Sequence, residues 1–173
     1  FLTGKNSLNE KHNTDKPVSF YAATKKFNEL MAYTYSHNYS FRCTGLRFFT
    51  LYGPLGRPDM AIYKFVEFMK NNKTVELYNN GNNKRDFTYI DDAVNAVLKI
   101  ISNNFNNGNL HNIYNIGNAK PISVNNLIKY IAEILKVNYS VKKMPRQMGD
   151  VFYTKADITK ITEDFGWKPK ISI

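Results

Sequence analysis

The sequence predicts an α/β domain, in which short buried strands alternate with amphipathic helices. Apolar residues recur every three to four positions in several stretches, as expected of helices with one buried face. Brief runs rich in Val, Ile, Tyr and Phe stand between those stretches and are typical of strands. The 173 residues, 43% of them hydrophobic, are enough for a buried core and exclude a disordered chain.

Three segments form the first part of this pattern. From Pro17 to Tyr39 the apolar residues follow a helical period, with proline in the first turn, so a helix is predicted there. Residues 41–49 predict a buried strand that closes on the turn Tyr52-Gly53-Pro54. A second helix is predicted from Met60 to Asn71.

The middle of the chain predicts two strands, 75–78 and 87–90, on either side of a polar, solvated loop at 79–85. Asp91 then suits the N-cap of a helix that runs to residue 101, because a carboxylate there accepts free amide protons. Its neighbour Asp92 is read in the same way, since adjacent residues at a helix start do not face each other as a catalytic pair would.

The remaining elements follow the same rules. Residues 111–116 predict a strand, and Ser123 suits the N-cap of a helix that ends near Leu135. Residues 139–142 are expected to be extended, and residues 156–166 to form one short helix.

The charge of the chain is strongly positive, with 24 basic and 14 acidic side chains and a formal net charge of +10. Nucleic-acid binding would need those basic residues to be clustered, but they are spread singly or in pairs. We therefore expect a solvated surface that attracts a small phosphorylated ligand, and no nucleic-acid partner.

Membrane, secretion and metal signals are weak in this sequence. No apolar run approaches the roughly 20 residues that span a bilayer, and the first ten residues do not read as a secretion signal. Cys43 is the only cysteine, and His12, His37 and His111 are scattered. We therefore expect a cytoplasmic protein with no membrane partner, no internal disulfide and no metal site.

Tyr21 and Lys25 are the first candidate catalytic residues. Four positions apart on a helix, they lie on one face, and a cation beside a phenol favours the phenolate. Such a phenol can take or give a proton near neutral pH. Tyr139 and Lys143 repeat the spacing, but on an expected strand, where they would stand ~13 Å apart. Taken alone, the first pair is better explained as an aromatic residue of an amphipathic helix beside a solvated lysine.

Three segments of the sequence carry a likeness to a known family: PVSFYAATKKFNELMAYTYSHNY, TGLRFFTLYGPLGRPDMAIYKF and KRDFTYIDDAVNAV. With them the chain resembles the extended short-chain dehydrogenase/reductase family, the NAD-dependent epimerases and dehydratases. Within that family it is most similar to the UDP-glucuronate 4-epimerases of the capsular-polysaccharide type. The likeness covers nearly the whole chain in the family's order and spacing.

This resemblance implies a partial Rossmann-like fold, the late strands and helices of an NAD-binding domain, plus a small α/β substrate-binding domain. Residues 1–59 would end the NAD-binding domain, and residues 60–173 would mainly bind the nucleotide sugar, with residues 87–101 and part of the next strand returning to the first domain. The chain would lack the family's Gly-rich turn, catalytic Ser or Thr and final helix. We therefore expect this portion alone to be inactive.

The resemblance also implies roles for residues that match the family. Tyr21 would be the catalytic acid and base, and Lys25 would hold the nicotinamide ribose of NAD. Thr50 and Arg57 would lie beside the sugar, where a forked guanidinium suits a carboxylate. Arg85 would bind the diphosphate.

Two further roles and a partner are implied in the same way. Gln147 and Asp150 would form a second nucleotide contact, in which Asp150 accepts a hydrogen bond from a ribose hydroxyl. Relatives commonly form homodimers through the helix of Tyr21, so a homodimer is expected of the full-length protein.

The implied reaction interconverts UDP-glucuronate and UDP-galacturonate by NAD-dependent oxidation and re-reduction at carbon 4, in polysaccharide biosynthesis. Other enzyme functions stay open: a 4-epimerase of UDP-hexose or UDP-N-acetylhexosamine, a sugar-nucleotide 4,6-dehydratase, or a decarboxylase. A truncated or degenerate nucleotide-binding module is the non-enzymatic alternative.

Overall fold

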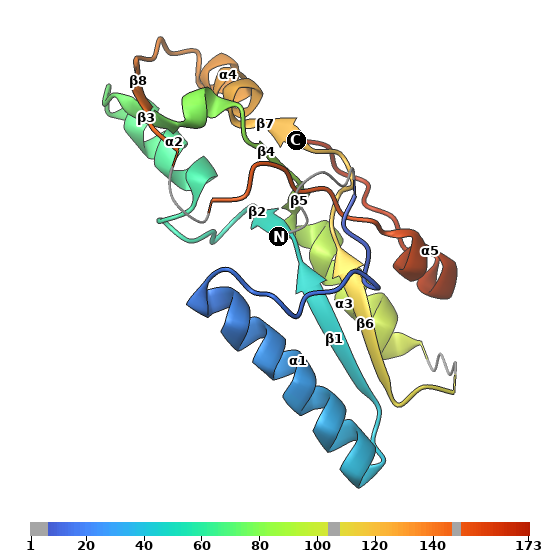
Figure 1. Ribbon diagram of the computed structural model, residues 1–173. Helices are drawn as coiled ribbons and strands as arrows, with labels where there is room; N and C mark the ends of the chain where they lie inside the picture. Colours follow the sequence, from blue (N-terminus) through green and yellow to red (C-terminus); the bar gives the residue numbers. More distant parts are fainter. Residues whose placement is uncertain (1–6, 104–107, 147–149) are drawn as a thin grey trace.

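The computed structural model describes residues 7–103, 108–146 and 150–173, which form two lobes joined by short strands (Figure 1). The lower lobe in Figure 1 contains α1 (Phe20–Tyr39), β1 (Cys43–Phe48), α3 (Ile90–Ser102), β6 (His111–Ile116) and α5 (Thr159–Phe165). The upper lobe contains α2 (Ala61–Lys70), β3 (Val75–Tyr78), the 3-10 turn η1 (Asn79–Gly81), α4 (Val124–Leu135) and β8 (Val141–Met144). Between them lie β2 (Thr50–Tyr52), β4 (Lys84–Arg85), β5 (Phe87–Tyr89) and β7 (Ile122–Ser123). The predicted α/β class is confirmed.

Among the described residues three of the four strand pairs are parallel, so each of these pairs needs a crossover connection. β1 runs beside β6, with Cys43 opposite His111 and Phe48 opposite Ile116. β2 pairs with β5 and β3 with β8, whereas β4 and β7 are antiparallel. In the described ranges β1 has a partner strand along one edge only.

Serine side chains set the starts of two helices. Ser19 caps α1, because its Oγ accepts the backbone N–H of Ala22 at 3.1 Å. The helix therefore begins at Phe20, later than the expected start at Pro17. Ser123 caps α4 as predicted, since its Oγ accepts the backbone N–H of Asn126 at 3.2 Å.

The expectation that Asp91 and Asp92 cap a helix is wrong. α3 begins at Ile90, so both carboxylates fall inside its first turn, and the N-cap residue Tyr89 makes no side-chain capping bond. Asp92 is buried, and its Oδ2 accepts the backbone N–H groups of Lys170 and Ile171 at 3.0 and 2.9 Å. The carboxylate therefore holds the C-terminal segment against α3.

Each lobe has its own apolar core. The upper core is formed by Phe65, Met69, Val75, Leu77, Phe87, Leu127, Ile128, Ile131 and Ala132. The lower core is formed by Ala93, Ala96, Tyr114, Ile116, Ile161 and Trp167.

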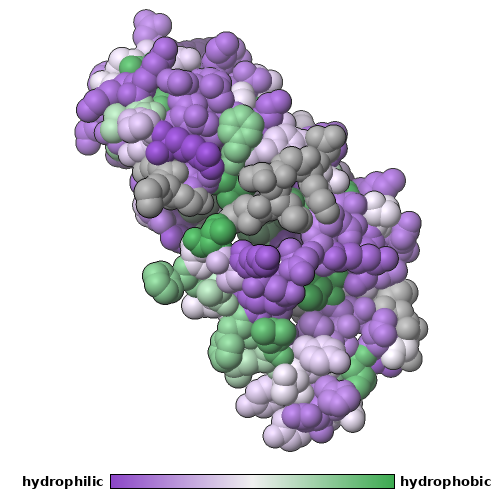
Figure 2. All heavy atoms as spheres, in the orientation of Figure 1, coloured by the Kyte–Doolittle hydropathy of each residue, from purple (hydrophilic) through white to green (hydrophobic). Residues whose placement is uncertain are grey.

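Helix α1 contributes to neither core. Its only buried residue is Ser36, whose Oγ donates to the Phe41 carbonyl at 2.6 Å. Figure 2 shows apolar atoms gathered over α1 at the lower left of the molecule. The large exposed side chains of this helix are Phe20, Tyr21, Phe27, Leu30, Met31, Tyr33, Tyr35 and Tyr39.

Asp86 ties three separate parts of the chain together. This fully buried carboxylate accepts backbone N–H groups from Asn118 at 2.7 Å, Ala119 at 2.9 Å and Ala156 at 2.8 Å. Burial raises the pKa of Asp86, and the three amide protons oppose that rise. Gly117 permits the approach, because a Cβ there would collide with Ala156.

We predict that Asp86→Ala lowers the free energy of unfolding by about 3–5 kcal/mol, because three amides that it pairs would lose their acceptor. Urea denaturation measures the change. Asp91→Ala is the control, since Asp91 is exposed and its loss should cost less than about 1 kcal/mol. Equal losses in the two variants would contradict the role given to Asp86.

Candidate active site

Tyr21 and Lys25 lie one turn apart on the same face of α1. The Nζ of Lys25 is 5.2 Å from the centroid of the Tyr21 ring, and the tyrosine is 72% exposed. The predicted juxtaposition of a phenol and a cation is therefore present. The second copy of the motif differs as expected, because Lys143 lies on strand β8 and Tyr139 just before it.

Arg57 lies in the loop that follows β2, where its guanidinium binds the carboxylate of Asp59. Its Nε and Nη2 reach the two oxygens of Asp59 at 3.0 and 2.5 Å, so the pair is bidentate. The pair raises the pKa of Arg57 and holds the pKa of Asp59 below its ordinary value. Tyr21 makes a smaller electrostatic contribution to the raised pKa of Arg57.

The backbone around β2 sets the direction of the loop that carries Arg57. Thr50 opens β2, pairs in register with Phe87 and donates its backbone N–H to the Asp86 carbonyl at 3.1 Å. Gly53 then turns the chain with φ +140°, and a Cβ there would lie 2.5 Å from a methyl of Ile90. Only glycine permits this turn, which leads from the carboxyl end of β2 toward Arg57.

A second polar group is formed by Arg85 and Asp150. The Nη2 of Arg85 lies 2.5 Å from Oδ1 of Asp150, and both side chains are largely shielded from solvent. Arg146 donates to the backbone carbonyl of Asp150 at 2.9 Å. The structure thus brings together two of the three predicted nucleotide-binding residues, and Gln147 lies outside the described residues.

Asn83 is a member of this second group that the sequence prediction missed. It is only 3% exposed, although residues 79–85 were expected to be solvated. Its Nδ2 donates to Oδ2 of Asp150 at 2.5 Å, and its Oδ1 accepts from Asn79 at 2.6 Å. The sequence signal for an ordered turn was the run Asn79-Asn80-Gly81, because Asn and Gly tolerate left-handed backbone. The structure shows such backbone, with φ of 49°, 53° and 70°.

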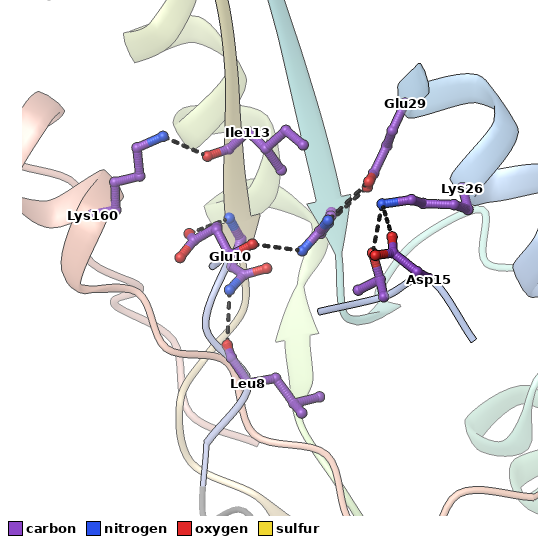
Figure 3. Close-up of polar contacts among 10 residues, drawn as sticks. Leu8, Glu10, Asp15, Lys26, Glu29, Ile113 and Lys160 are labelled. Carbon is purple, nitrogen blue, oxygen red and sulfur yellow. Dashed lines mark hydrogen bonds and ion pairs between the residues drawn. The ribbon is translucent and has the colours of Figure 1, made fainter. Parts of the chain in front are cut away.

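An ion pair anchors the helix that carries Tyr21 (Figure 3). Arg47 of β1 donates from Nε and Nη2 to the two oxygens of Glu29 at 2.7 and 2.8 Å. The guanidinium holds the pKa of Glu29 below its ordinary value of 4.5. A weaker tie joins Lys26 of α1 to Asp15 at 2.9 Å in a more exposed place.

The segment before α1 is fixed across β6, also visible in Figure 3. Oε1 of Glu10 accepts the backbone N–H of Asn115 at 2.8 Å. The Asn115 side chain donates to the Leu8 carbonyl at 2.8 Å. These bonds fix the path by which the chain enters α1.

A hollow of about 450 Å³ lies between this segment, α1 and the strands. Its charged lining includes Glu10, Lys26, Glu29 and Arg47. The predicted site residues within the described ranges do not line it. Within those same ranges, no group of three or more His, Cys, Asp or Glu side chains is arranged to hold a metal ion.

Comparison with known families matches residues 3–117 to the NAD dependent epimerase/dehydratase family. The chain belongs to that family. The match spans α1, with its Tyr21 and Lys25, as well as Arg57 and Arg85. The family and the sequence resemblance therefore agree.

Individual family members are similar over almost the whole chain. An uncharacterized protein of Methanocaldococcus jannaschii is 44% identical, over 96% of this chain and 50% of its own length. UDP-glucuronate 4-epimerase 6 of Arabidopsis thaliana is 41% identical, over 97% of this chain and 39% of its own length.

Solved structures of the family confirm the Rossmann-like expectation. The UDP-glucuronic acid 4-epimerase of Bacillus cereus, in complex with UDP-glucuronic acid and NAD, superposes with a TM-score of 0.88 at 28% identity. That match covers 96% of this chain and 52% of the epimerase. The chain thus spans about half the length of these family members, or less. Among the described residues, no helix is long and apolar enough to cross a membrane.

We predict that Glu29→Gln lowers the free energy of unfolding at pH 7 by about 1 kcal/mol, since a partly exposed ion pair is lost. The folded pKa of Glu29 is depressed, so its stabilisation is present above pH 4.5 and is lost as the pH falls below that value. The difference between variant and parent should therefore shrink in acid. Urea denaturation at several pH values measures it, and Asp15→Asn, which breaks the more exposed pair with Lys26, should give a smaller difference. A difference that grows in acid would contradict this assignment.

Proposed function

We propose that the chain is the catalytic-helix and nucleotide-sugar-binding portion of a UDP-glucuronate 4-epimerase. One observation carries the proposal: Tyr21 and Lys25 lie on one face of α1, and the guanidinium of Arg57, in the loop after β2, binds a carboxylate with two nitrogens. Relatives that bear this enzyme name support the choice. The reaction interconverts UDP-glucuronate and UDP-galacturonate by inversion at carbon 4.

Tyr21 carries the proton chemistry in this proposal. As phenolate it takes the proton of the sugar's 4-hydroxyl, while the C4–H bond breaks and a 4-keto sugar forms. Lys25 stabilises the phenolate through its positive charge. After the keto sugar has turned over in the site, Tyr21 returns the proton to the 4-oxygen, so the phenolate is restored.

The exposed residues at the start of α1 fit the nicotinamide end of NAD. Tyr21 and Lys25 present a hydroxyl and an ammonium side by side, and Lys25 would donate to a ribose hydroxyl. When bound there, NAD would supply the acceptor for the hydride that leaves carbon 4 and the donor for its return to the opposite face.

Arg57 and Thr50 hold the carboxylate of the sugar in this proposal. The fork of Arg57 already binds a carboxylate of this geometry on Asp59, so the uronate would exchange with an internal carboxylate. The keto intermediate is a β-keto acid that can lose carbon dioxide. A fixed carboxylate disfavours the geometry that this loss requires.

The Arg85–Asp150 group would bind the UDP portion. Arg85 carries the charge for the diphosphate, and Asp150 accepts a hydrogen bond from a ribose hydroxyl, a contact in which the sequence resemblance also places Gln147. We also propose the domain division at residue 59, with 87–101 and part of the next strand returning to the cofactor domain. The two separate cores support two units, but Phe87 packs in the upper core, and Ile161 and Trp167 pack in the lower one.

We infer that the full-length protein is a homodimer that acts in the cytoplasm, in polysaccharide biosynthesis. The apolar face of α1 supports an interface, because large aromatic side chains there have little contact with the rest of the described chain.

We predict that Tyr21→Phe in the full-length protein abolishes turnover, because removal of the hydroxyl removes the proton acceptor. Chromatography of the two UDP-uronates measures the interconversion. Tyr35→Phe, an exposed tyrosine farther along α1, is the control and should retain activity. Undiminished turnover by Tyr21→Phe would rule out the proposed mechanism.

We predict that Arg57→Met raises the KM for UDP-glucuronate by about 10- to 100-fold, because a charge-assisted bidentate contact is lost. The KM for any neutral UDP-hexose that reacts should change far less. Arg42→Met, an exposed arginine just before β1, serves as the control. Equal effects on charged and neutral sugars would instead favour a 4-epimerase of UDP-hexose.

A further inference from the structure

We propose that Asn83 is a positioning residue, which fixes the carboxylate of Asp150 and thereby keeps Arg85 ready for the substrate's diphosphate. The inference rests on the proposed function, since it assigns the Arg85–Asp150 group to the UDP portion. The sequence predicts a solvated loop at residues 79–85, yet Asn83 lies almost wholly inside the molecule.

The carboxylate of Asp150 is held at both oxygens by different residues. Oδ2 accepts from Nδ2 of Asn83 at 2.5 Å, and Oδ1 accepts from Nη2 of Arg85 at 2.5 Å. The other terminal nitrogen of Arg85, Nη1, donates to the Lys84 carbonyl at 3.0 Å. Arg85 therefore meets Asp150 through a single nitrogen instead of the two-pronged contact that such pairs favour.

This one-pronged contact has a functional consequence. Without the amide of Asn83, Oδ2 would be free to turn toward the guanidinium and close a bidentate pair. Such a pair would engage both a second arginine donor and the second carboxylate oxygen. A diphosphate needs the arginine donor, and a ribose hydroxyl needs the carboxylate oxygen. Because Asn83 uses only one lone pair of Oδ2, it leaves the other lone pair and the arginine donor available for UDP.

The orientation of the Asn83 amide is itself fixed. A carboxylate only accepts hydrogen bonds, so Asn83 must turn its nitrogen toward Asp150 and its oxygen toward Asn79. Asn79 donates to that oxygen at 2.6 Å. The backbone carbonyl of Asn83 also accepts the N–H of Val124, which anchors it at the start of α4.

The test is UDP binding to the full-length protein, measured by isothermal titration calorimetry. Asn83→Leu removes the donor and should weaken UDP binding about tenfold, the worth of one hydrogen bond to a charged group. The KM for UDP-glucuronate should rise in parallel, and kcat should fall far less.

Asn79→Asp is a second variant that leaves Asn83 in place. It replaces the donor by a carboxylate, which draws the nitrogen of Asn83 away from Asp150, and aspartate tolerates the left-handed backbone of this position. UDP binding should weaken here as well, and Asn79→Ser, which keeps a hydroxyl donor, should restore part of it.

Asn125→Ala is the matched control, because Asn125 donates to the Asn80 carbonyl of the same turn but does not lead to Asp150. It should leave the UDP dissociation constant within twofold. Unchanged UDP binding in Asn83→Leu and Asn79→Asp, or an equal loss in Asn125→Ala, would overturn the inference. If the unchanged protein fails to bind UDP, the proposed function falls, and the inference with it.

Discussion

The buried carboxylate of Asp86 is the constraint on which both groups of candidate site residues depend. It sits between Arg85 and strand β5, and its backbone carbonyl receives the N–H of Thr50. Its side chain fixes the loop after β6 and the segment that begins at Ala156. A buried carboxylate is costly unless its oxygens accept hydrogen bonds, so the folded chain must bring the backbone amides of Asn118, Ala119 and Ala156 to Asp86. That convergence aligns β2 with β5 and so places the loops that end each strand.

The site side chains themselves are held by polar ties more than by apolar packing. Arg47 joins α1 to β1 through Glu29, and Asn83 joins the turn after β3 to Asp150. Both contacts bridge segments that are far apart in the sequence. A hydrogen-bonded polar side chain keeps its partners in few orientations, whereas an apolar side chain packs in several. Polar contacts therefore suit residues whose side chains must be held in one orientation.

Much of the fold could be predicted from local patterns, because helix periods, Ser123 and the turn at Gly53 act within a few residues. The roles of Asp86, Asp92 and Asn83 could not, since each depends on partners that lie more than 30 residues away. Asp92 looked like a helix cap and instead receives a distant segment. The spacing of Tyr21 and Lys25 predicts that they share a helix face, but only the family resemblance gives them a catalytic role, and the contact of Arg57 with Asp59 required the actual path of the loop.

The apolar face of α1 has a consequence for the energetics of the whole protein. A helix that buries a single serine gains little free energy from its own lobe, so fraying its first turn costs little. Any surface that covers Phe27, Leu30 and Met31 binds the ordered helix in preference to the frayed one. Binding of a surface to this face therefore stabilises, by mass action, the helical turn that carries Tyr21. Whatever strengthens that binding also keeps the phenol in its place.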